Sequence, residues 1–496
     1  MFKVAFLCPG YESLGVEYLS GSLRQNGFDT RLFLDPILFA ETGFIDNPYL
    51  AGIFSFRSKV LRDIKAYSPD IVCFSVISDN FQWACRWAEE VKASTAARVV
   101  FGGIHPTSVP DKVIQAEPVD YICLGEGDEA VVELAQAVRS GQDDTGIRNI
   151  WKKEQGRIFR NPVRPLIADL DRLPFPDKEL FYNAQPVFRK GYLAMTSRGC
   201  AYSCSYCCNN VYHDLYGRKE ALIRRRSVGN VVEELVKARQ RYAPRYIAFA
   251  DDCFNNDSFW LSVFLREYRD KVSLPFSCYL FPDMVDEAQV LALKEAGCCK
   301  VQFGLQVISP EKRRLVLGRP SSQDKIARAI DLCRRHGLFV VCDSILGFPD
   351  ETEAELEELA RFYMEHMPDH CENFWLRYYP GTALTAWALK QGYIDHKKHE
   401  LIESGTQSFG LLKRPENAAG QTYSRQIRML LMLFPFLSYN AKCWWLTNRR
   451  YRHIPVLPSM LMYILVRLFR HPPFDLNIDR TRDRYGYFMR KRLVGV

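Results

Sequence analysis

The chain has 496 residues, of which 47% are hydrophobic and 25% are charged, the composition of an ordinary folded protein and not of a disordered or fibrous one. A chain of this length can form two or three domains, each with its own hydrophobic core. Its 16 cysteines would indicate disulfides in a small secreted protein, but the first residues lack the long apolar stretch of a signal peptide, so we expect reduced thiols and a cytoplasmic location.

The first third of the chain alternates between strand and helix patterns. Residues 3–7 form a short apolar run that predicts a strand, and residues 14–24 carry apolar side chains at helical spacing. Further strands are expected at 30–34, 71–77, 99–101 and 121–124, with helices at 81–93 and 129–139. This alternation is typical of an α/β fold with a parallel, doubly wound (Rossmann-like) sheet, whose ligands bind at the carboxyl ends of the strands. We expect this domain to span residues 1–145.

Small and polar residues follow these strands, where a ligand would approach the sheet. Glycines let a ligand come close to the backbone, and hydroxyls and free amides can bind its polar groups. A generic nucleotide-binding fold or a regulatory domain would show a similar pattern. The candidate binding residues are Leu14, Gly15, Ser75, Ser78, Gly102, Gly103, His105, Thr107, Gly125, Glu126 and Gly127.

A proline-rich stretch at 160–183 indicates that residues 146–190 are a linker to a second domain.

The strand expected at 191–196 ends in a loop that carries Cys200, Cys204 and Cys207. A [4Fe–4S] cluster normally takes four cysteines, so three closely spaced ones leave one iron free to bind a small molecule. Zinc with a remote fourth ligand and ordinary buried cysteines are the alternatives. Cys208 could replace Cys207 in a misassembled cluster, and we interpret it as a packing or substrate-side residue.

Five more strand patterns follow, within 246–257, 276–280, 296–307, 339–352 and 375–384. They indicate a β/α barrel domain over residues 191–395, with its chemistry at the carboxyl ends of the strands. Asp251 and Asp252 come directly after the second of its strands, where they could also cap the next helix.

Taken together, these motifs resemble the radical S-adenosylmethionine enzymes that carry an N-terminal cobalamin-binding domain. The motifs that match the family are the C-x3-C-x2-C loop, Gly102-Gly103-x-His-Pro-Thr, Gly125-Glu-Gly-Asp, the Asp251-Asp252 segment and Gly-Phe-Pro-Asp-Glu-Thr at 347–352. The resemblance implies that residues 191–395 form a partial TIM-type (β/α)6 barrel. It also implies that the open iron binds S-adenosylmethionine and that the strand-end loops of the first domain cradle cobalamin. It also implies S-adenosylmethionine contacts from Tyr206, Asp251, Asp252, Gln306, Asp343 and Gly347.

The chain departs from the family pattern at several positions. Gln306 and Val307 stand where Glu and Ser are usual, and Asp350 replaces a glycine. The Asp-x-His-x-x-Gly signature that supplies a histidine to cobalt is absent, so we expect no protein histidine on the metal and a structural role for His105. The loop at 77–81 is then expected to face the lower side of cobalt.

The C-terminal region, 396–496, is expected to be mainly α-helical, apolar and basic. From residue 441 onward it has twelve Lys and Arg against three Asp, which indicates an anionic surface or partner. Its apolar segments at 427–437 and 457–469 are shorter than the ~20 residues that span a bilayer. With Trp444, Trp445, Arg449 and Arg450 nearby, they predict peripheral contact with the inner membrane surface. The alternative is a helical cap over the barrel mouth with solvated arginines, and no nucleic-acid-binding module is present.

The resemblance implies a cobalamin-dependent methyltransferase that acts on an unactivated carbon. An oxidative cyclase or rearrangement enzyme with the same cofactors and a non-catalytic cobalamin sensor are the alternatives. The sequence identifies no general base; Tyr206 and Tyr378 are the candidate catalytic residues. The expected partners are a small-molecule substrate of hydrophobic or lipid-like character and an external electron donor of the flavodoxin or ferredoxin type.

Overall fold

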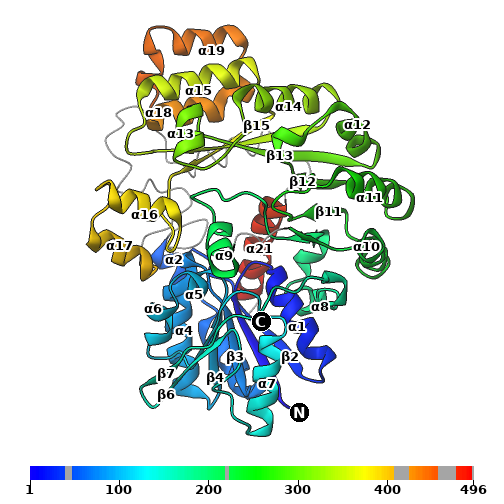
Figure 1. Cartoon of the computed structure of the whole chain (residues 1–496), viewed down its shortest axis with the longest axis vertical. Helices are drawn as coiled ribbons and strands as arrows, with labels where there is room; N and C mark the ends of the chain where they lie inside the picture. The colour runs from blue at the N-terminus through cyan, green and yellow to red at the C-terminus, as the bar shows by residue number, and fades with distance from the viewer. Residues whose placement is uncertain (40–46, 218–222, 407–423, 456–475, 494–496) are drawn as a thin grey trace.

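The computed structural model describes residues 1–39, 47–217, 223–406, 424–455 and 476–493. Two sheets stand one above the other, with the N-terminal sheet in the lower half of the molecule and the second sheet in the upper half (Figure 1). The expected segment at 457–469 lies outside the described residues. None of the helices in the described part of the chain is long and apolar enough to cross a membrane.

The N-terminal sheet has the strand order β2-β1-β3-β4-β5-β6-β7. The first five strands are parallel, which confirms the doubly wound domain. They are β1 (Lys3–Pro9), β2 (Asp29–Asp35), β3 (Ile71–Ser75), β4 (Arg98–Gly102) and β5 (Tyr121–Cys123). Because strand order reverses between β1 and β3, the carboxyl ends of these two strands open into a crevice of the kind where such sheets bind ligands.

Helices cover both faces of this sheet. Val4 and Phe6 of β1 pack on one side with α1 (Leu14–Gln25) and α7 (Ala130–Ser140). Ala5 and Leu7 pack on the other side with α3 (Arg57–Tyr67), α4 (Phe81–Ser94) and α6 (Pro110–Gln115). Alternate residues of the strand therefore supply two separate cores, as a strand buried on both faces requires. The short helices α2 (Pro48–Ile53), η1 (Ser78–Asn80) and α5 (Ile104–Ser108) complete the domain.

The segment expected to be a linker contributes to the first sheet. β6 (Ile150–Glu154) and β7 (Arg157–Phe159) form a hairpin that continues the sheet antiparallel to β5. The chain then passes through η2 (Leu170–Arg172), α8 (Lys178–Ala184) and η3 (Pro186–Lys190) to the second sheet.

The second sheet has six parallel strands in the order β15-β14-β13-β12-β11-β8. It is open between β8 and β15, which confirms a partial barrel. The strands are β8 (Gly191–Ala194), β11 (Tyr246–Phe249), β12 (Phe276–Tyr279), β13 (Cys298–Gln306), β14 (Phe339–Leu346) and β15 (His370–Trp375). The helices along the outside of the sheet are α10 (Val228–Tyr242), α11 (Ser258–Lys271), α12 (Glu287–Glu295), α14 (Gln323–Arg335) and α15 (Glu353–Glu365) (Figure 1).

The alternation of β13 shows how the barrel is built. Val301, Phe303 and Leu305 are buried in the core shared with the outer helices, so Gln302 and Gln306 point to the inner face of the sheet. The connections carry η4 (Pro282–Met284), α13 (Pro310–Leu315), α16 (Ala383–Lys390) and α17 (His396–Glu403).

The described parts of the C-terminal region are helical, as expected, and they lie on two different surfaces. α18 (Ser424–Leu433), η5 (Phe434–Phe436), α19 (Tyr439–Leu446) and η6 (Thr447–His453) lie against α15 and β15 at the upper end of the molecule (Figure 1). The last helix, α21 (Leu476–Leu493), packs instead on the N-terminal domain. There Arg484 donates a hydrogen bond of 2.7 Å to the Gly10 carbonyl, and Phe488 lies against Phe56 with ring centroids 5.3 Å apart.

Candidate functional site

A cavity of about 370 Å³ lies where the two domains meet. Its walls are the carboxyl ends of the N-terminal strands, the residues Met195, Ser197, Arg198 and Gly199 that lead into the cysteine loop, and α9 (Asn209–Tyr216). Cys200, Cys204 and Cys207 are not among the described lining residues. Eight of the residues expected from the first domain line it: Leu14, Gly15, Ser75, Gly102, Gly103, Gly125, Glu126 and Gly127. The structure thus brings most of the candidate strand-end residues to a single cavity.

Two glycines allow the close packing of the loops that line this cavity. At Gly103, with φ of +103°, an added Cβ would lie 2.7 Å from the Val76 carbonyl oxygen. At Gly125, with φ of +67°, it would lie 1.8 Å from the Tyr216 hydroxyl. Both positions therefore need glycine for backbone conformation and for space. The cavity wall therefore combines glycine backbone with apolar side chains such as Phe74 and Leu19, and this mixed wall fits a large, largely apolar ligand such as a corrin.

Ser78, His105 and Thr107 lie behind the cavity wall and are not among its lining residues. The Ser78 hydroxyl lies 3.0 Å from Nδ1 of His105, and burial lowers the pKa of His105 to about 4, so this imidazole is neutral. The Thr107 hydroxyl donates to the Gly103 carbonyl at 2.8 Å and accepts from the Gly125 amide at 3.1 Å. The three side chains brace the strand-end loops from behind. None of the described lining residues comes from the loop at 77–81.

The three cysteines lie on the loop between β9 (Ser197–Arg198) and α9. Cys204 is buried, and Cys200 and Cys207 are half-buried. The Cys207 amide donates to the Cys204 carbonyl at 3.0 Å, which holds the second and third thiols on one tight turn. Burial raises the pKa of Cys200 to about 12, so positive iron at this loop would have to drive ionisation of the thiols.

Soft thiolate donors at this spacing fit an iron–sulfur cluster. Within the described ranges, no three His, Cys, Asp or Glu side chains are arranged to hold a single metal ion. The fit of Cys200, Cys204 and Cys207 to a cluster therefore rests on their spacing and donor chemistry.

Asp251 and Asp252 have different surroundings. The buried Asp251 carboxylate accepts hydrogen bonds from the Thr196 amide and from the hydroxyls of Thr196 and Ser197, at 2.6–3.1 Å. These bonds fix the chain just before the cysteine loop. Asp252 lines the cavity and accepts from the Asn209 amide group at 3.0 Å. Of the two carboxylates, Asp252 is the one placed to meet a ligand.

Gln306, Asp343 and Gly347 lie on β13, β14 and the loop after β14, away from the residues that line the cavity. Gln302 donates from its amide to both oxygens of Asp343 at 2.9 Å. Burial and the neighbouring Glu372 raise the pKa of Asp343 to about 7. The expected S-adenosylmethionine contacts are thus divided between the cavity and the other half of the barrel.

Tyr206 and Tyr378 pack with the same apolar cluster beneath the cysteine loop. The Tyr206 hydroxyl accepts from Arg319 at 3.4 Å, and the Arg319 guanidinium lies 4.8 Å from the Phe281 ring centroid. Tyr378 is 5% exposed. Arg319 is a functional candidate that the sequence patterns missed, because it stands in a loop with no motif of its own.

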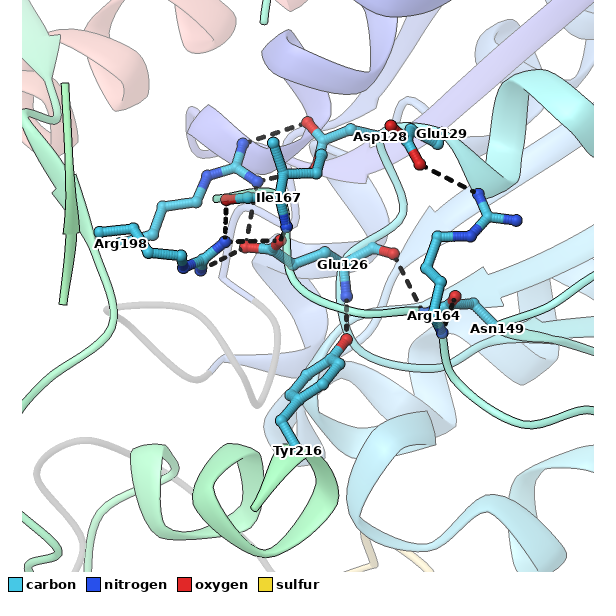
Figure 2. Close-up of polar contacts among 9 residues, drawn as sticks. Glu126, Asp128, Glu129, Asn149, Arg164, Ile167, Arg198 and Tyr216 are labelled. Atoms are coloured by element: carbon cyan, nitrogen blue, oxygen red, sulfur yellow. Dashed lines mark hydrogen bonds and ion pairs between the residues drawn. The ribbon is translucent and has the colours of Figure 1, made fainter. Parts of the chain in front are cut away.

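The patterns also missed residues of the cavity wall. Tyr212 and Tyr216 line it from α9, and their rings are parallel within 4° at 6.5 Å. Their spacing of four residues on a helix directly after the cysteine loop could have indicated them. Arg198 and Arg224 also line the cavity, and Figure 2 shows Arg198 reaching Asp128 and Glu126 of the N-terminal domain.

The fold and this cavity define a two-domain enzyme class, in which a cobalamin-binding sheet is joined to an iron–sulfur barrel. A model of the B12 binding domain matches residues 9–135, and a model of the radical SAM superfamily matches residues 195–363. An uncharacterized methyltransferase, PH0819, from Pyrococcus horikoshii is 30% identical over 388 residues, which is 77% of this chain and 79% of that protein. The chain belongs to the cobalamin-dependent radical S-adenosylmethionine enzymes, whose cofactors are a [4Fe–4S] cluster, S-adenosylmethionine and cobalamin.

Other relatives carry different named activities. The cytidylyl-2-hydroxyethylphosphonate methyltransferase of Streptomyces wedmorensis is 25% identical, with 81% of this chain and 82% of that protein covered. The anaerobic magnesium-protoporphyrin IX monomethyl ester cyclase of Rubrivivax gelatinosus is 26% identical, with coverage of 76% and 68%. The solved radical S-adenosylmethionine methyltransferase TsrM from Kitasatospora setae shares the fold, with a TM-score of 0.63, 20% identity and coverage of 79% and 75%.

Proposed function

We propose that this enzyme methylates an unactivated carbon of a small-molecule substrate. One observation carries the proposal: the cavity at the domain junction is lined both by the glycine-rich strand ends and by the flanks of the cysteine loop. For this reaction, bound S-adenosylmethionine would be the source of a 5′-deoxyadenosyl radical for hydrogen abstraction, and bound cobalamin would be the carrier of the methyl group. The methyltransferase relatives with broad coverage favour this reaction.

The chain's own residues would act by binding and positioning. Cys200, Cys204 and Cys207 would hold the cluster, and Gly102, Gly103, Gly125, Glu126 and Gly127 would cradle cobalamin, with His105 and Thr107 bracing them. Asp252 and Tyr206 would face S-adenosylmethionine from the cysteine-loop side, and Gln306, Asp343 and Gly347 from the other half of the barrel. Asp251 would act indirectly, because its carboxylate is engaged with Thr196 and Ser197.

Oxidative cyclisation is the second candidate, favoured by the relative from Rubrivivax gelatinosus. The two reactions differ in whether a methyl group enters the product. Reconstituted enzyme is incubated anaerobically with a cell extract, a reductant and S-adenosylmethionine that carries a trideuterated methyl group. A methyltransferase gives a product that contains the label, whereas a cyclase gives 5′-deoxyadenosine and an unlabelled product. Label-free products would overturn the first proposal.

A pair of cysteine variants tests the cluster assignment. We expect Cys204→Ala to lose the brown iron–sulfur absorbance and 5′-deoxyadenosine formation, because the two remaining thiolates are too few to hold the cluster. The matched variant Cys208→Ala removes an exposed thiol of the same loop, and we expect it to retain both. Iron analysis after anaerobic reconstitution provides the measurement. The reverse result would show that Cys208, and not Cys204, is a ligand of the cluster.

We further propose a flavodoxin or ferredoxin as electron donor and a cytoplasmic enzyme that contacts the inner membrane surface. The contact would be made by Phe436, Tyr439 and Trp444, whose side chains are 43%, 60% and 52% exposed. Arg450 lies 4.6 Å from the Trp444 ring centroid. Exposed aromatic rings beside a cation favour the interface between lipid headgroups and acyl chains. A hydrophobic substrate delivered from the bilayer would agree with this arrangement.

A further inference from the structure

Both flanks of the cysteine loop are held by one loop of the N-terminal domain. That loop joins β5 to α7, and its residues Gly125, Glu126, Gly127 and Asp128 line the cavity. On the near flank, Arg198 precedes Cys200 by two residues and binds Asp128 with two hydrogen bonds, of 2.8 and 3.1 Å. On the far flank, the Glu126 amide donates to the Tyr216 hydroxyl at 3.0 Å (Figure 2).

A second arginine strengthens the near flank. β9 and β10 (Arg224–Arg225) form a two-stranded ribbon in which Arg198 and Arg224 are cross-strand partners. Arg224 donates to both oxygens of Glu126, at 2.7 and 2.9 Å, and to the Ile167 carbonyl at 2.8 Å. Arg198 also reaches Glu126 at 3.3 Å. Two like charges side by side would repel each other without the two carboxylates opposite them.

These four side chains are only 5–15% exposed. At this burial a charge that loses its partner is costly, and a planar guanidinium that binds a carboxylate with two bonds fixes direction as well as distance. The set Glu126, Asp128, Arg198 and Arg224, hereafter the interdomain clasp, therefore resists small shifts between the domains. Tyr216 adds a neutral contact at the other end of the cysteine loop.

We propose that the interdomain clasp is a positioning device, which sets the place of the cysteine loop relative to the cobalamin cavity and couples the two cofactor sites. This proposal rests on the proposed cofactor sites, and it adds a role for residues that contact neither cysteine nor substrate. Coupling of this kind is reciprocal: if an assembled cluster tightens cobalamin binding, bound cobalamin must favour the cluster-loaded loop by the same factor.

The first test measures position directly. The full chain is reconstituted with its cluster, loaded with hydroxocobalamin and reduced until both centres are paramagnetic, and their dipolar interaction is read by electron paramagnetic resonance. We expect one well-defined interaction in the wild type and a weaker, broadened one in Arg198→Gln/Arg224→Gln. Arg164→Gln is the matched control, because Arg164 is also 15% exposed but pairs with Glu129 and Glu133 of its own domain, and we expect it to match the wild type.

The second test measures coupling. Hydroxocobalamin affinity is titrated by absorbance with and without the assembled cluster. We expect cluster assembly to tighten binding about tenfold in the wild type, within the usual range of such couplings, and to have almost no effect in the double variant. If the double variant does not fold, Tyr216→Phe removes one hydrogen bond without loss of packing and should lower the factor partway.

The outcomes separate the two proposals. Failure of the wild type to bind cobalamin and a cluster overturns the proposed function. Normal cofactor content with an unchanged dipolar interaction and coupling factor in the clasp variants overturns the positioning role alone. Restoration of the interaction by the exchanged pair Arg198→Asp/Asp128→Arg supports the role, since that variant regains the ion pair.

Discussion

At the scale of single residues, two glycines with left-handed backbone conformation allow the cost of steric crowding to be distinguished from the cost of backbone strain. Gly125 and Gly141 have φ of +67° and +64°, but only at Gly125 would a Cβ meet other atoms. We expect Gly141→Ala to lower the free energy of unfolding by about 1 kcal/mol, the cost of the strained backbone. Gly125→Ala should cost about 3 kcal/mol, because the Tyr216 ring must move as well. Urea unfolding of the cofactor-free chain measures both.

The same two variants test the cavity. Gly125→Ala should also weaken hydroxocobalamin binding, whereas Gly141→Ala, at the end of α7, should bind as the wild type does. Equal cobalamin affinities in the two variants would show that the loop after β5 does not form part of the binding surface.

Asp343 gives the protein a pH-dependent stability. Its pKa is raised to about 7 by burial and by Glu372, from about 4 in an unfolded chain. Between these values the folded state binds more protons than the unfolded state, so stability falls as pH rises through this window and stays low above it. Asp343→Asn cannot ionise, and we expect its Tm to rise relative to wild type between about pH 5 and about pH 8. Glu358→Gln, at an exposed site on α15, is the control for loss of one carboxylate, and a pH-dependent gain in Tm of the same size in both variants would contradict the role of Asp343.

Residues that belong to a local pattern could be found from the sequence, and residues defined by distant contacts could not. The three cysteines lie within eight positions, and the glycines follow recognisable strands. Arg224 acquires its role from Glu126, which is 98 residues away, and nothing in the local sequence of either indicates the other. For Asp251, the motif was visible, but its engagement with the backbone of Thr196 depends on strand pairing.

At the scale of elements, variants of α21 test whether this helix stabilises the N-terminal domain. Phe488 is 6% exposed and packs on Phe56 of that domain. We expect Phe488→Ala to lower the free energy of unfolding by about 3 kcal/mol, the usual cost of such a cavity. Arg490→Ala, at an exposed position of the same helix, should stay within about 0.5 kcal/mol of wild type. Equal stabilities in urea would show that α21 does not stabilise the domain.

Alternation of strands and helices was enough to predict the first sheet, because each strand and helix has its own period of apolar residues. For the second sheet, the later strands were predicted from short motifs that resemble those of the family. The β6–β7 hairpin was missed inside an expected linker, since its pairing with β5 is a tertiary contact. The position of α21 was missed for the same reason: its contacts join residues as much as 474 positions apart. Periodicity reveals an element but not the surface that it covers.

At the scale of the whole molecule, the two ends have different surroundings. The cavity lies where the two domains meet and α21 packs on the N-terminal domain, while α19 and η6 lie at the far end of the barrel domain (Figure 1). Membrane contact at α19 would keep both the N-terminal domain and the interdomain clasp away from the lipid surface. Of the basic side chains there, Arg449 and Arg452 already pair with Glu353, so the contact would depend more on aromatic rings than on charge.

The membrane proposal therefore makes a specific prediction about side-chain type. The wild-type chain should cosediment with phosphatidylcholine/phosphatidylglycerol vesicles, and Tyr439→Ala/Trp444→Ala should reduce the bound fraction severalfold, because each ring contributes about 1 kcal/mol at an interface. Phe259→Ala removes an aromatic ring that is 79% exposed on α11 and should bind as the wild type does. Because most of the attraction is apolar, binding should survive ~0.5 M salt, which screens exposed charges. A wild type that stays in the supernatant, or a Phe259→Ala variant that binds as poorly as the double variant, would remove α19 as a membrane contact and leave it as a cap on the barrel.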